Sequence, residues 1–227
     1  MILLDLYRKF REKKLYKQLG HIGKHSHIGF PVMISKPTQV YIEDFAGILN
    51  GAKIIVNEGR FILGKYSRIA SGLTVVTDNH TPTVGLPYFF TGGLHINDRP
   101  KDVIVKEDCW IGANVTLLPG AILNRGGVIA ACALVNKEFP PYAVIAGIPA
   151  KIIGVKFSIE EIIEHEKNIY PLEERLDKEY LTNIFNTYYS NVRVITHSNI
   201  TNDNKHELKE KLKQYNINYS DDCWIKL

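Results

Sequence analysis

Aliphatic residues recur at a spacing of six along three tracts of the chain, at 22–40, 63–75 and 105–135. Neither the 3.6-residue period of an α-helix nor the two-residue period of an ordinary strand produces this spacing. Chance spacing within a β-sandwich is the alternative, but no position of the three tracts breaks the pattern. The aliphatic positions are Ile22, Ile28, Ile34, Val40, Leu63, Ile69, Val75, Val105, Ile111, Leu117, Leu123, Ile129 and Val135.

A six-residue unit suits one short strand followed by one tight corner. Three such units close a triangular coil of about 18 residues, and stacked coils form parallel sheets with the aliphatic side chains inside. The residue after the aliphatic one is often glycine or alanine, as at Gly64 and Gly112, and small residues suit a corner with little room. The pattern therefore predicts an all-β core, a parallel β-helix of hexapeptide repeats, over residues 21–155.

The pattern is interrupted twice. From Val40 to Leu63 is 23 residues, one short of four units, which predicts a shortened unit or an altered corner within 41–62. Residues 80–104, which contain three prolines and three glycines, interrupt the pattern again. Long insertions into a regular frame often carry function. We expect residues 80–104 to project from one corner as an arm.

The segments on either side of the repeats have helical spacing. Residues 1–20 predict a basic helix that caps the open end of the coils, with attachment to a membrane surface as the alternative. Residues 156–227 predict a helical region, in which a capping-box pattern begins at Ser158 and Pro171 separates two helices. A further charged helix is expected near 204–214, within an Asn-rich tail.

Composition narrows the class of protein without specifying its function. The 227 residues are 45% hydrophobic and 23% charged, and we expect neither a membrane span nor a signal peptide. Three scattered cysteines, Cys109, Cys132 and Cys223, suit neither a disulfide framework nor a metal site and favour a cytoplasmic protein. A net charge of +4 suits an anionic ligand, but no basic stripe with interleaved aromatics predicts nucleic-acid binding.

Short motifs within and after the third tract narrow the predicted protein family further. The sequence WIG at 110–112, a Pro-Gly corner at 119–120, PPY at 140–142 and GIPAK at 147–151 follow one another in order. In this combination, residues 21–155 resemble the hexapeptide-repeat acyltransferases, such as the galactoside, maltose and polysaccharide O-acetyltransferases. The resemblance implies a left-handed β-helix, a homotrimer, and acetyl-CoA bound as co-substrate in the groove between neighbouring subunits.

Acyl transfer to a hydroxyl needs a general base, because an alcohol is a poor nucleophile at neutral pH. Histidine, with an ordinary pKa of about 6.5, suits this task. His80 lies where the second tract runs into the arm, and the resemblance implies that it is the catalytic base. A structural loop histidine is the alternative, and His95 within the arm is the second candidate base. The separation of 30 residues between His80 and Trp110 is longer than is usual in the family and indicates a different arm.

The resemblance also assigns residues to coenzyme A. Trp110 is expected beside the acetyl-transfer site, and the small Ala113 and Ala131 where the pantetheine arm approaches the backbone. Lys137 and Lys151 are expected near the phosphates. A backbone N–H around Ala113 is the candidate oxyanion donor. The alternatives are interface packing for the tryptophan and the alanines, and solvated surface positions for the lysines.

Acceptor recognition is less well defined. Asn50, Asp78 and Asn79 are candidates for hydrogen bonds with sugar hydroxyls, although Asn and Asp also serve as corner residues. The aromatic residues at 88–90 in the arm could stack on a sugar or pack against a second subunit. For all of these residues, a structural role is at least as well supported as acceptor binding.

The sequence therefore predicts an acetyl-CoA-dependent O-acetyltransferase that acts directly on a saccharide hydroxyl, with no covalent acyl-enzyme. N-acetylation of an amino sugar and acetylation of a xenobiotic on the same scaffold are the alternatives among enzymes. A zinc carbonic anhydrase on this prism would need three converging histidines, whereas none lies between His95 and His165. A non-catalytic scaffold would have no need of His80, Trp110 and the GIPAK motif. Neither a metal nor a nucleic acid is expected as a partner.

Overall fold

The computed structural model describes residues 10–196, 202–215, 218–220 and 223–226. The chain divides into two compact units, Met1–Ile153 and Gly154–Leu227, so the boundary lies just before the expected end of the repeat domain at 155. The first unit holds the repeats and the arm, and the second holds the C-terminal helices.

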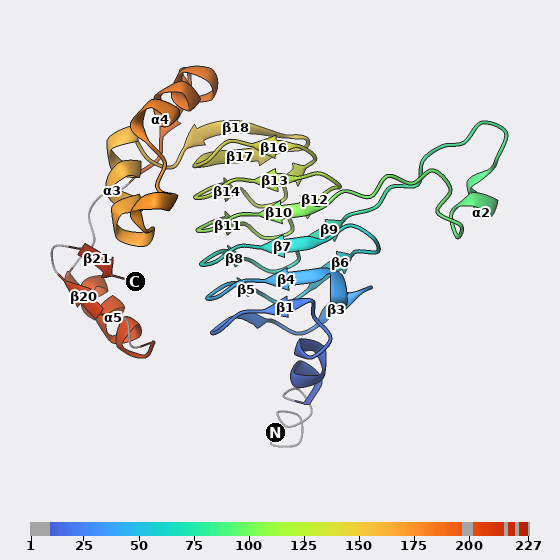
Figure 1. Cartoon of the computed structure of the whole chain (residues 1–227), viewed down its shortest axis with the longest axis horizontal. Coiled ribbons are helices and arrows are strands. Elements are labelled where there is room, and N and C mark those ends of the chain that lie inside the picture. The colour runs from blue at the N-terminus through green and yellow to red at the C-terminus, as the bar shows by residue number, and fades with distance from the viewer. Residues whose placement is uncertain (1–9, 197–201, 216–217, 221–222, 227) are drawn as a thin grey trace. The chain divides into compact units, whose positions relative to one another are not determined.

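The first unit is a parallel β-helix in which successive coils add short strands to three faces (Figure 1). We name the faces A, B and C in the order in which the chain meets them. Face A consists of β1 (His21–Ile22), β4 (Val40–Ile42), β7 (Phe61–Leu63), β10 (Val103–Val105), β13 (Ile122–Leu123) and β16 (Glu138–Phe139). Face B consists of β2 (His27–Ile28), β5 (Gly47–Ile48), β8 (Arg68–Ile69), β11 (Trp110–Ile111), β14 (Val128–Ile129), β17 (Ala143–Gly147) and β18 (Ala150–Val155). Face C consists of β3 (Val32–Ile34), β6 (Ala52–Ile55), β9 (Thr74–Val76), β12 (Thr116–Leu117) and β15 (Leu134–Val135).

The aliphatic ladder of the sequence forms the core between the three faces. Ile111 lies in register with Ile69 on one side and Ile129 on the other, and none of the three is more than 1% exposed. The pattern repeats on faces A and C, because a strand that points one residue inward points its neighbours outward. The narrow interior requires close packing of these aliphatic groups. From Val40 onward, the predicted inward position of the ladder is confirmed.

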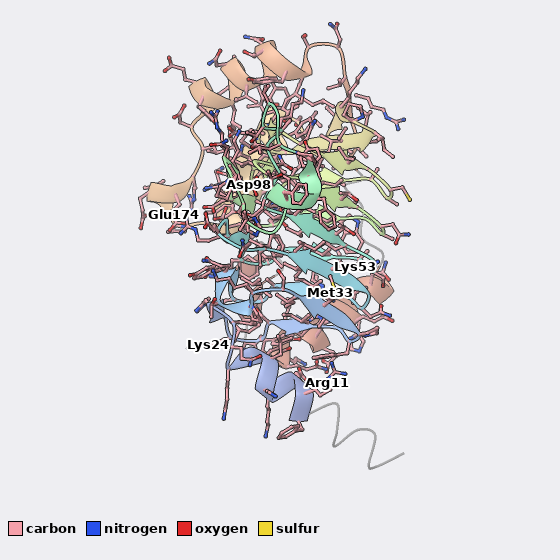
Figure 2. The ribbon with its side chains drawn as sticks, turned by 90° about the vertical axis from the view of Figure 1, so that its right-hand side faces the viewer. Arg11, Lys24, Met33, Lys53, Asp98 and Glu174 are labelled. Carbon is pink, nitrogen blue, oxygen red and sulfur yellow. The ribbon has the colours of Figure 1, made fainter. Side chains whose placement is uncertain are left out.

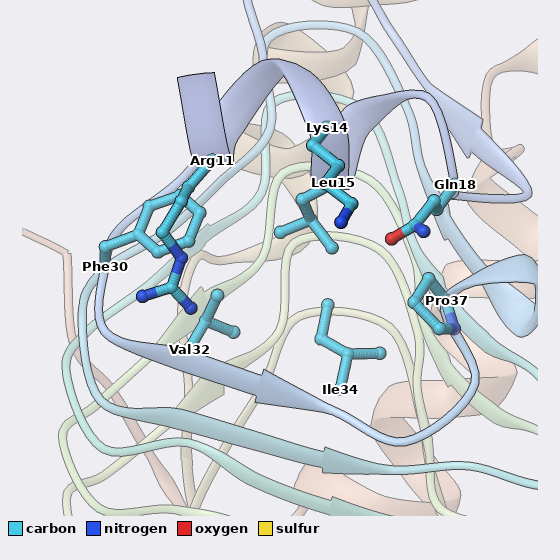
Figure 3. Close-up of a pocket in the computed structure, with 8 residues that line it drawn as sticks. All are labelled: Arg11, Lys14, Leu15, Gln18, Phe30, Val32, Ile34 and Pro37. Carbon is cyan, nitrogen blue, oxygen red and sulfur yellow. The ribbon is translucent and has the colours of Figure 1, made fainter. Parts of the chain in front are cut away.

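The first coil is less completely buried, since Ile22 and Ile34 are only half-buried. A helix at residues 10–16 covers this open end, where the Tyr16 hydroxyl accepts the Ile28 N–H over 3.0 Å. A pocket of about 280 Å³ remains between the helix and the coil (Figure 3). Its apolar wall consists of Leu15, Phe30, Val32 and Ile34, and its basic rim consists of Arg11 and Lys14. The helix expected over 1–20 is therefore present at 10–16, while residues 1–9 lie outside the described part of the chain.

The register shows that the break within 41–62 is an altered corner, one of the two expected causes, and not a shortened unit. Ile22 pairs with Ile42 and Ile42 pairs with Leu63, so these coils span 20 and 21 residues and are longer than three six-residue units. Extra residues lie in the corner between face C and face A, which in the first coil contains the 3-10 turn η1 (Pro37–Gln39). The spacing misled because Val40 and Ile42 both point inward from one three-residue strand, and only Ile42 is equivalent to Leu63.

The arm leaves the prism after β9 and returns into β10 (Figure 1). Val103 and Ile104 belong to β10, so the arm ends at residue 102 rather than at 104. It carries one short helix, α2 (Tyr88–Thr91). Its two limbs are joined at the base, where the Lys101 N–H donates to the Thr77 carbonyl oxygen over 2.9 Å. The arm therefore projects from the corner between face C and face A.

The second unit is mainly helical. α3 (Ile159–Ile169) begins with the expected capping box: Ser158 Oγ accepts the Glu161 N–H over 3.2 Å, and the Glu161 carboxylate accepts the Ser158 N–H over 2.8 Å. Pro171 follows Tyr170, the C-cap residue of α3, and the charged helix expected near 204–214 is α5. The remaining elements are η2 (Leu172–Glu174), α4 (Lys178–Ile184), η3 (Phe185–Tyr189), β19 (Arg193–Val194), α5 (Asn202–Lys213), β20 (Asn218–Ser220) and β21 (Cys223–Lys226). Among the residues described, no helix has the length and apolar character that a membrane crossing requires.

Two neighbouring isoleucines of β6 test the inward and outward assignment. Ile54 is 0% exposed and Ile55 is 42% exposed. Ile54→Ala is expected to lower the free energy of unfolding by about 2–5 kcal/mol, because it leaves a cavity in the prism. Ile55→Ala, the matched control, is expected to change it by less than about 0.5 kcal/mol. Denaturant titration at one protein concentration measures both, and equal losses would contradict the assignment.

Candidate active site

His80 lies at the root of the arm, just after the last strand of its coil on face C. Thr77 is fully buried at the end of this strand, and the chain then turns outward, so that His80 is exposed. Because the Lys101–Thr77 hydrogen bond closes the base of the arm, the root has a fixed geometry even though the arm itself projects. The position of His80 is thus set by the end of β9.

The returning limb of the arm brings Asp98 against His80 (Figure 2 labels Asp98). Asp98 Oδ2 lies 3.2 Å from His80 Nδ1 and 3.0 Å from His95 Nδ1. The other carboxylate oxygen accepts the Thr81 N–H over 2.9 Å. The two imidazole rings stack, with their centroids 5.5 Å apart and their planes at 28°. One carboxylate therefore organises both histidines of the arm.

The carboxylate is much less accessible than the histidines that it contacts. The Asp98 side chain is 8% exposed, compared with 53% for His80 and 45% for His95. The Thr81 N–H, followed by the two imidazoles, holds the pKa of Asp98 below its ordinary value, so that the group is an anion at neutral pH. An anion at this position can orient an imidazole and stabilise its protonated form.

Asp98 is the residue of this cluster that the sequence did not predict. It follows His80 by 18 residues within an irregular segment, where no repeat fixes which side chains meet. The available signal was His95 with an aspartate three residues later. Across the part of the chain that is described, His80, His95 and Asp98 form the one group of three potential metal ligands whose donor atoms all lie within 4.8 Å.

The three acceptor candidates have different surroundings. The Asp78 carboxylate accepts the Asn57 N–H over 3.0 Å, the Glu58 N–H over 3.4 Å and the Thr77 hydroxyl over 2.6 Å. Asp78 therefore fastens its corner to the preceding coil, which is a structural role. Asn50 Oδ1 accepts the Ser71 hydroxyl over 2.7 Å at a different corner, between face B and face C.

Asn79 is the remaining acceptor candidate. It is exposed and directly precedes His80, so it is the one of the three whose side chain lies at the arm root without a structural hydrogen bond among those found in the described residues. Of the three, Asn79 is therefore the best situated to meet an acceptor bound at His80.

The expected coenzyme A residues lie mainly on face B and its edge. Trp110 begins β11, points outward and is 51% exposed, with Arg68 and Val128 as its in-register neighbours. Ala113 and Ala131 lie in stacked corners between face B and face C, where the coils approach closely. A Cβ atom added to Gly112 would lie 2.5 Å from the Ala131 nitrogen. Packing of adjacent coils therefore requires a glycine at 112, and the half-buried Ala113 and the exposed Ala131 leave the backbone within reach of a ligand.

The two lysines lie apart from each other. Lys137 is exposed in the corner between β15 and β16, on the same edge of the prism as His80, and its Nζ lies 5.3 Å from the centre of the Phe139 ring. Lys151 is exposed in β18, next to the buried Ala150. Each lysine is accessible to an anion in solvent, but within one chain the two lysines do not lie at the same site.

A single chain also separates His80 from Trp110, Ala113 and Ala131. The corner that holds Ala113 pairs with the one before β9, since the Asn114 N–H donates to the Ser71 carbonyl oxygen over 2.9 Å. His80 instead follows β9. The width of face C thus lies between the candidate base and the candidate coenzyme wall within one chain.

Comparison with known proteins finds similarity to acetyltransferases. No family model matches the chain. It is similar to a chloramphenicol acetyltransferase of Morganella morganii, with 32% identity over 130 residues, which cover 51% of this chain and 62% of the relative. It is also similar to the galactoside O-acetyltransferase of Escherichia coli K12, with 24% identity over 161 residues, 70% of this chain and 72% of the relative. The chain spans between 55% and 64% of the length of the first four curated relatives that it matches.

Solved structures share the fold. A hexapeptide-repeat acetyltransferase from Vibrio cholerae, solved with acetyl coenzyme A, has a TM-score of 0.57 and 21% identity, and the match covers 65% of this chain and 77% of the other. A maltose O-acetyltransferase from Clostridium difficile 630 has a TM-score of 0.56 and 21% identity, over 65% of this chain and 75% of the other. The expected fold, a left-handed parallel β-helix with flanking helices, is confirmed.

The structural role of Asp78 gives a stability prediction. Asp78→Ala leaves the Asn57 and Glu58 N–H groups without their acceptor. We expect it to lower the free energy of unfolding by about 1–3 kcal/mol. Asn79→Ala, the neighbouring control, is expected to change it by less than about 0.5 kcal/mol. Thermal and denaturant unfolding measure both, and a stability loss in Asn79→Ala alone would reverse the two roles.

Proposed function

We propose that this chain, a relative of the hexapeptide-repeat acetyltransferases, transfers the acetyl group of acetyl-CoA to a hydroxyl of a saccharide. The observation that carries the proposal is His80, exposed at the root of the arm with Asp98 at its Nδ1 atom. This arrangement leaves Nε2 of a neutral imidazole available as a proton acceptor. Because acetyl-CoA is used inside cells, the proposed activity also implies a cytoplasmic protein.

In the proposed reaction, His80 removes the proton from the acceptor hydroxyl as its oxygen attacks the thioester carbonyl carbon. A carbon–oxygen bond forms, and the carbon–sulfur bond of acetyl-CoA breaks as the tetrahedral intermediate collapses. The protonated imidazole then gives its proton to the departing thiolate of coenzyme A. The transfer is direct, with no acyl-enzyme, and a backbone N–H near Ala113 is the proposed donor to the oxyanion.

We further propose that acetyl-CoA lies between two subunits of a homotrimer. His80 of one subunit would face Trp110, Ala113 and Ala131 of the next, since within one chain Trp110 lies on face B and face C separates the two alanines from His80. Lys137 and Lys151 remain the proposed partners of the coenzyme phosphates. The arm supports this assembly, because a second subunit would cover its exposed apolar side chains, which are Val84, Leu86, Tyr88, Phe89, Phe90 and Leu94.

Two classes of acceptor have support from relatives. The names of the galactoside and maltose O-acetyltransferases favour a saccharide. The name of the first relative, a chloramphenicol acetyltransferase at 32% identity, favours a hydroxyl-bearing xenobiotic as the second candidate. Incubation with acetyl-CoA and a panel of galactosides, maltose, amino sugars and chloramphenicol, followed by mass spectrometry, distinguishes the two and also detects N-acetylation. Asn79, beside His80, is the proposed acceptor contact.

Replacement of His80 tests the proposed base. His80→Ala is expected to lower kcat for acetyl transfer by about 10²–10⁴-fold, the usual contribution of a general base. The Kd for coenzyme A, measured by calorimetry, should stay within about twofold, because the base acts mainly on the transition state. His206→Ala, which removes an exposed histidine of α5, is the control and should retain the wild-type rate. Wild-type transfer by purified His80→Ala would refute the assignment.

Subunit mixing tests whether the site is shared between chains. His80→Ala and Ala131→Trp should each be inactive alone, the second because the indole would block the coenzyme wall. Co-expressed in equal amounts, they should recover about a quarter of wild-type activity, because a quarter of the interfaces in a cyclic trimer combine His80 from one chain with Ala131 from the next. If both residues act within one chain, no mixed assembly contains an intact site and activity stays at the level of the variants.

A further inference from the structure

We propose that Asp98 is the positioning residue of His80. We also propose that His95 holds Asp98 in place by a hydrogen bond to the carboxylate oxygen that contacts His80. The proposal rests on the function proposed above and adds a contribution of the returning limb of the arm to catalysis. Asp98 does not touch the substrates. It acts by fixing which nitrogen of His80 carries the proton and where the other nitrogen points.

The carboxylate of Asp98 favours one tautomer of the imidazoles that it contacts. An ionised carboxylate only accepts hydrogen bonds, so an imidazole bound through Nδ1 must donate from Nδ1. His95 Nδ1 forms a hydrogen bond with Asp98 Oδ2 at 3.0 Å, and His80 Nδ1 lies 3.2 Å from the same oxygen in an ion-pair contact. Because a carboxylate repels the lone pair of a nearby nitrogen, both contacts favour a neutral ring with its proton on Nδ1, which leaves the lone pair of Nε2 directed away from Asp98. A general base requires this arrangement at His80.

The carboxylate is itself fixed by two hydrogen bonds, one from each limb. Thr81, next to His80 on the outgoing limb, donates its N–H to Oδ1 over 2.9 Å. His95 approaches Oδ2 from the returning limb. With 8% of its side chain exposed, Asp98 has little access to competing water. It therefore joins the two limbs at the level of the proposed base.

The backbone of the returning limb adopts an uncommon conformation that serves this contact. His95 has a φ of 51° and Asn97 a φ of 61°, the left-handed region that residues other than glycine rarely occupy. Asn97 also donates from Nδ2 to the Thr83 hydroxyl over 3.3 Å, which ties the limbs together again. Such conformations persist where the surrounding contacts impose them, and they concentrate at functional sites. Here they turn His95 and Asp98 toward His80.

The charge on Asp98 has a second consequence during the reaction. As His80 takes the proton of the acceptor, it becomes a cation, and the adjacent carboxylate stabilises this form. The stacked His95, with its ring centre 5.5 Å away, would destabilise the cation if it were protonated as well. Asp98 lies against both rings and offsets that repulsion. The negative charge, and not only the shape of the side chain, is thus part of the proposal.

The test compares Asp98→Asn with the wild type by a spectroscopic and a kinetic readout. Long-range ¹⁵N correlation spectra should show His80 protonated at Nδ1 in the wild type. In Asp98→Asn the amide can donate to Nδ1 and should favour the Nε2–H tautomer. We expect kcat to fall by about 10²–10⁴-fold, with KM for acetyl-CoA within about twofold, because the tautomer matters in the chemical step.

Two further variants separate positioning from folding of the arm. Asp98→Glu keeps the charge and should retain more activity than Asp98→Asn. Asp102→Asn, on the same limb, removes the carboxylate bound to Arg60 at 2.6 Å, which makes no contact with His80. It should leave both the His80 tautomer and kcat unchanged. Equal losses of activity in Asp98→Asn and Asp102→Asn would indicate a general effect on the arm and overturn the proposal.

Two other results would overturn the proposal. The first is a wild-type His80 protonated at Nε2, which decides the matter even if Asp98→Asn does not fold. The second is a stoichiometric divalent cation in the purified protein whose removal by EDTA abolishes transfer, because Asp98 and both histidines would then be metal ligands. If the wild type acetylates no acceptor but His80 carries its proton on Nδ1, the proposed function fails while the positioning of His80 by Asp98 stands.

Discussion

The stacking of one inward aliphatic residue on the same residue of the next coil is the interaction on which the rest of the structure depends. A single coil cannot bury these side chains, so each coil requires its neighbours. The register holds across the arm: Leu63 pairs with Val105, although a whole insertion separates them in sequence. The core therefore keeps the corners of successive coils in line along the β-helix. A single corner can lengthen without disturbing the coils on either side.

This property explains how an exposed arm can present a defined site. The frame fixes both ends of the arm, at the end of β9 and the start of β10, and the Lys101–Thr77 hydrogen bond closes its base. Asp78 fastens the same corner to the coil below. Asp98 then adds a contact between the limbs one level further out. These hydrogen bonds and the ion-pair contact of Asp98 with His80 connect the proposed base to the core, so the geometry of His80 does not depend on the tip of the arm.

The features that the sequence predicted are those that the repeat dictates. An inward position in a narrow prism accepts only apolar side chains, so the ladder and the parallel β-helix could be inferred from spacing alone. The same spacing failed at Val40, because a three-residue strand points two residues inward and the pattern does not say which is equivalent to Leu63. His80 could be located because the repeat stops beside it. Asp98 could not, because its contacts form between the limbs of an irregular loop, where sequence separation carries no information about distance.

The arrangement has a consequence for how such a protein can change its acceptor. In the function that we propose, the donor meets a wall of stacked corners at Ala113 and Ala131, where the packing of adjacent coils already requires glycine at 112. The acceptor meets the arm, whose length the core does not restrict. A substitution at Gly112 would disturb the packing of the wall and the donor site together, whereas a change in the arm leaves the stacked coils intact. Acceptor preference can therefore diverge on an unchanged donor site, provided that the arm retains the carboxylate that orients His80.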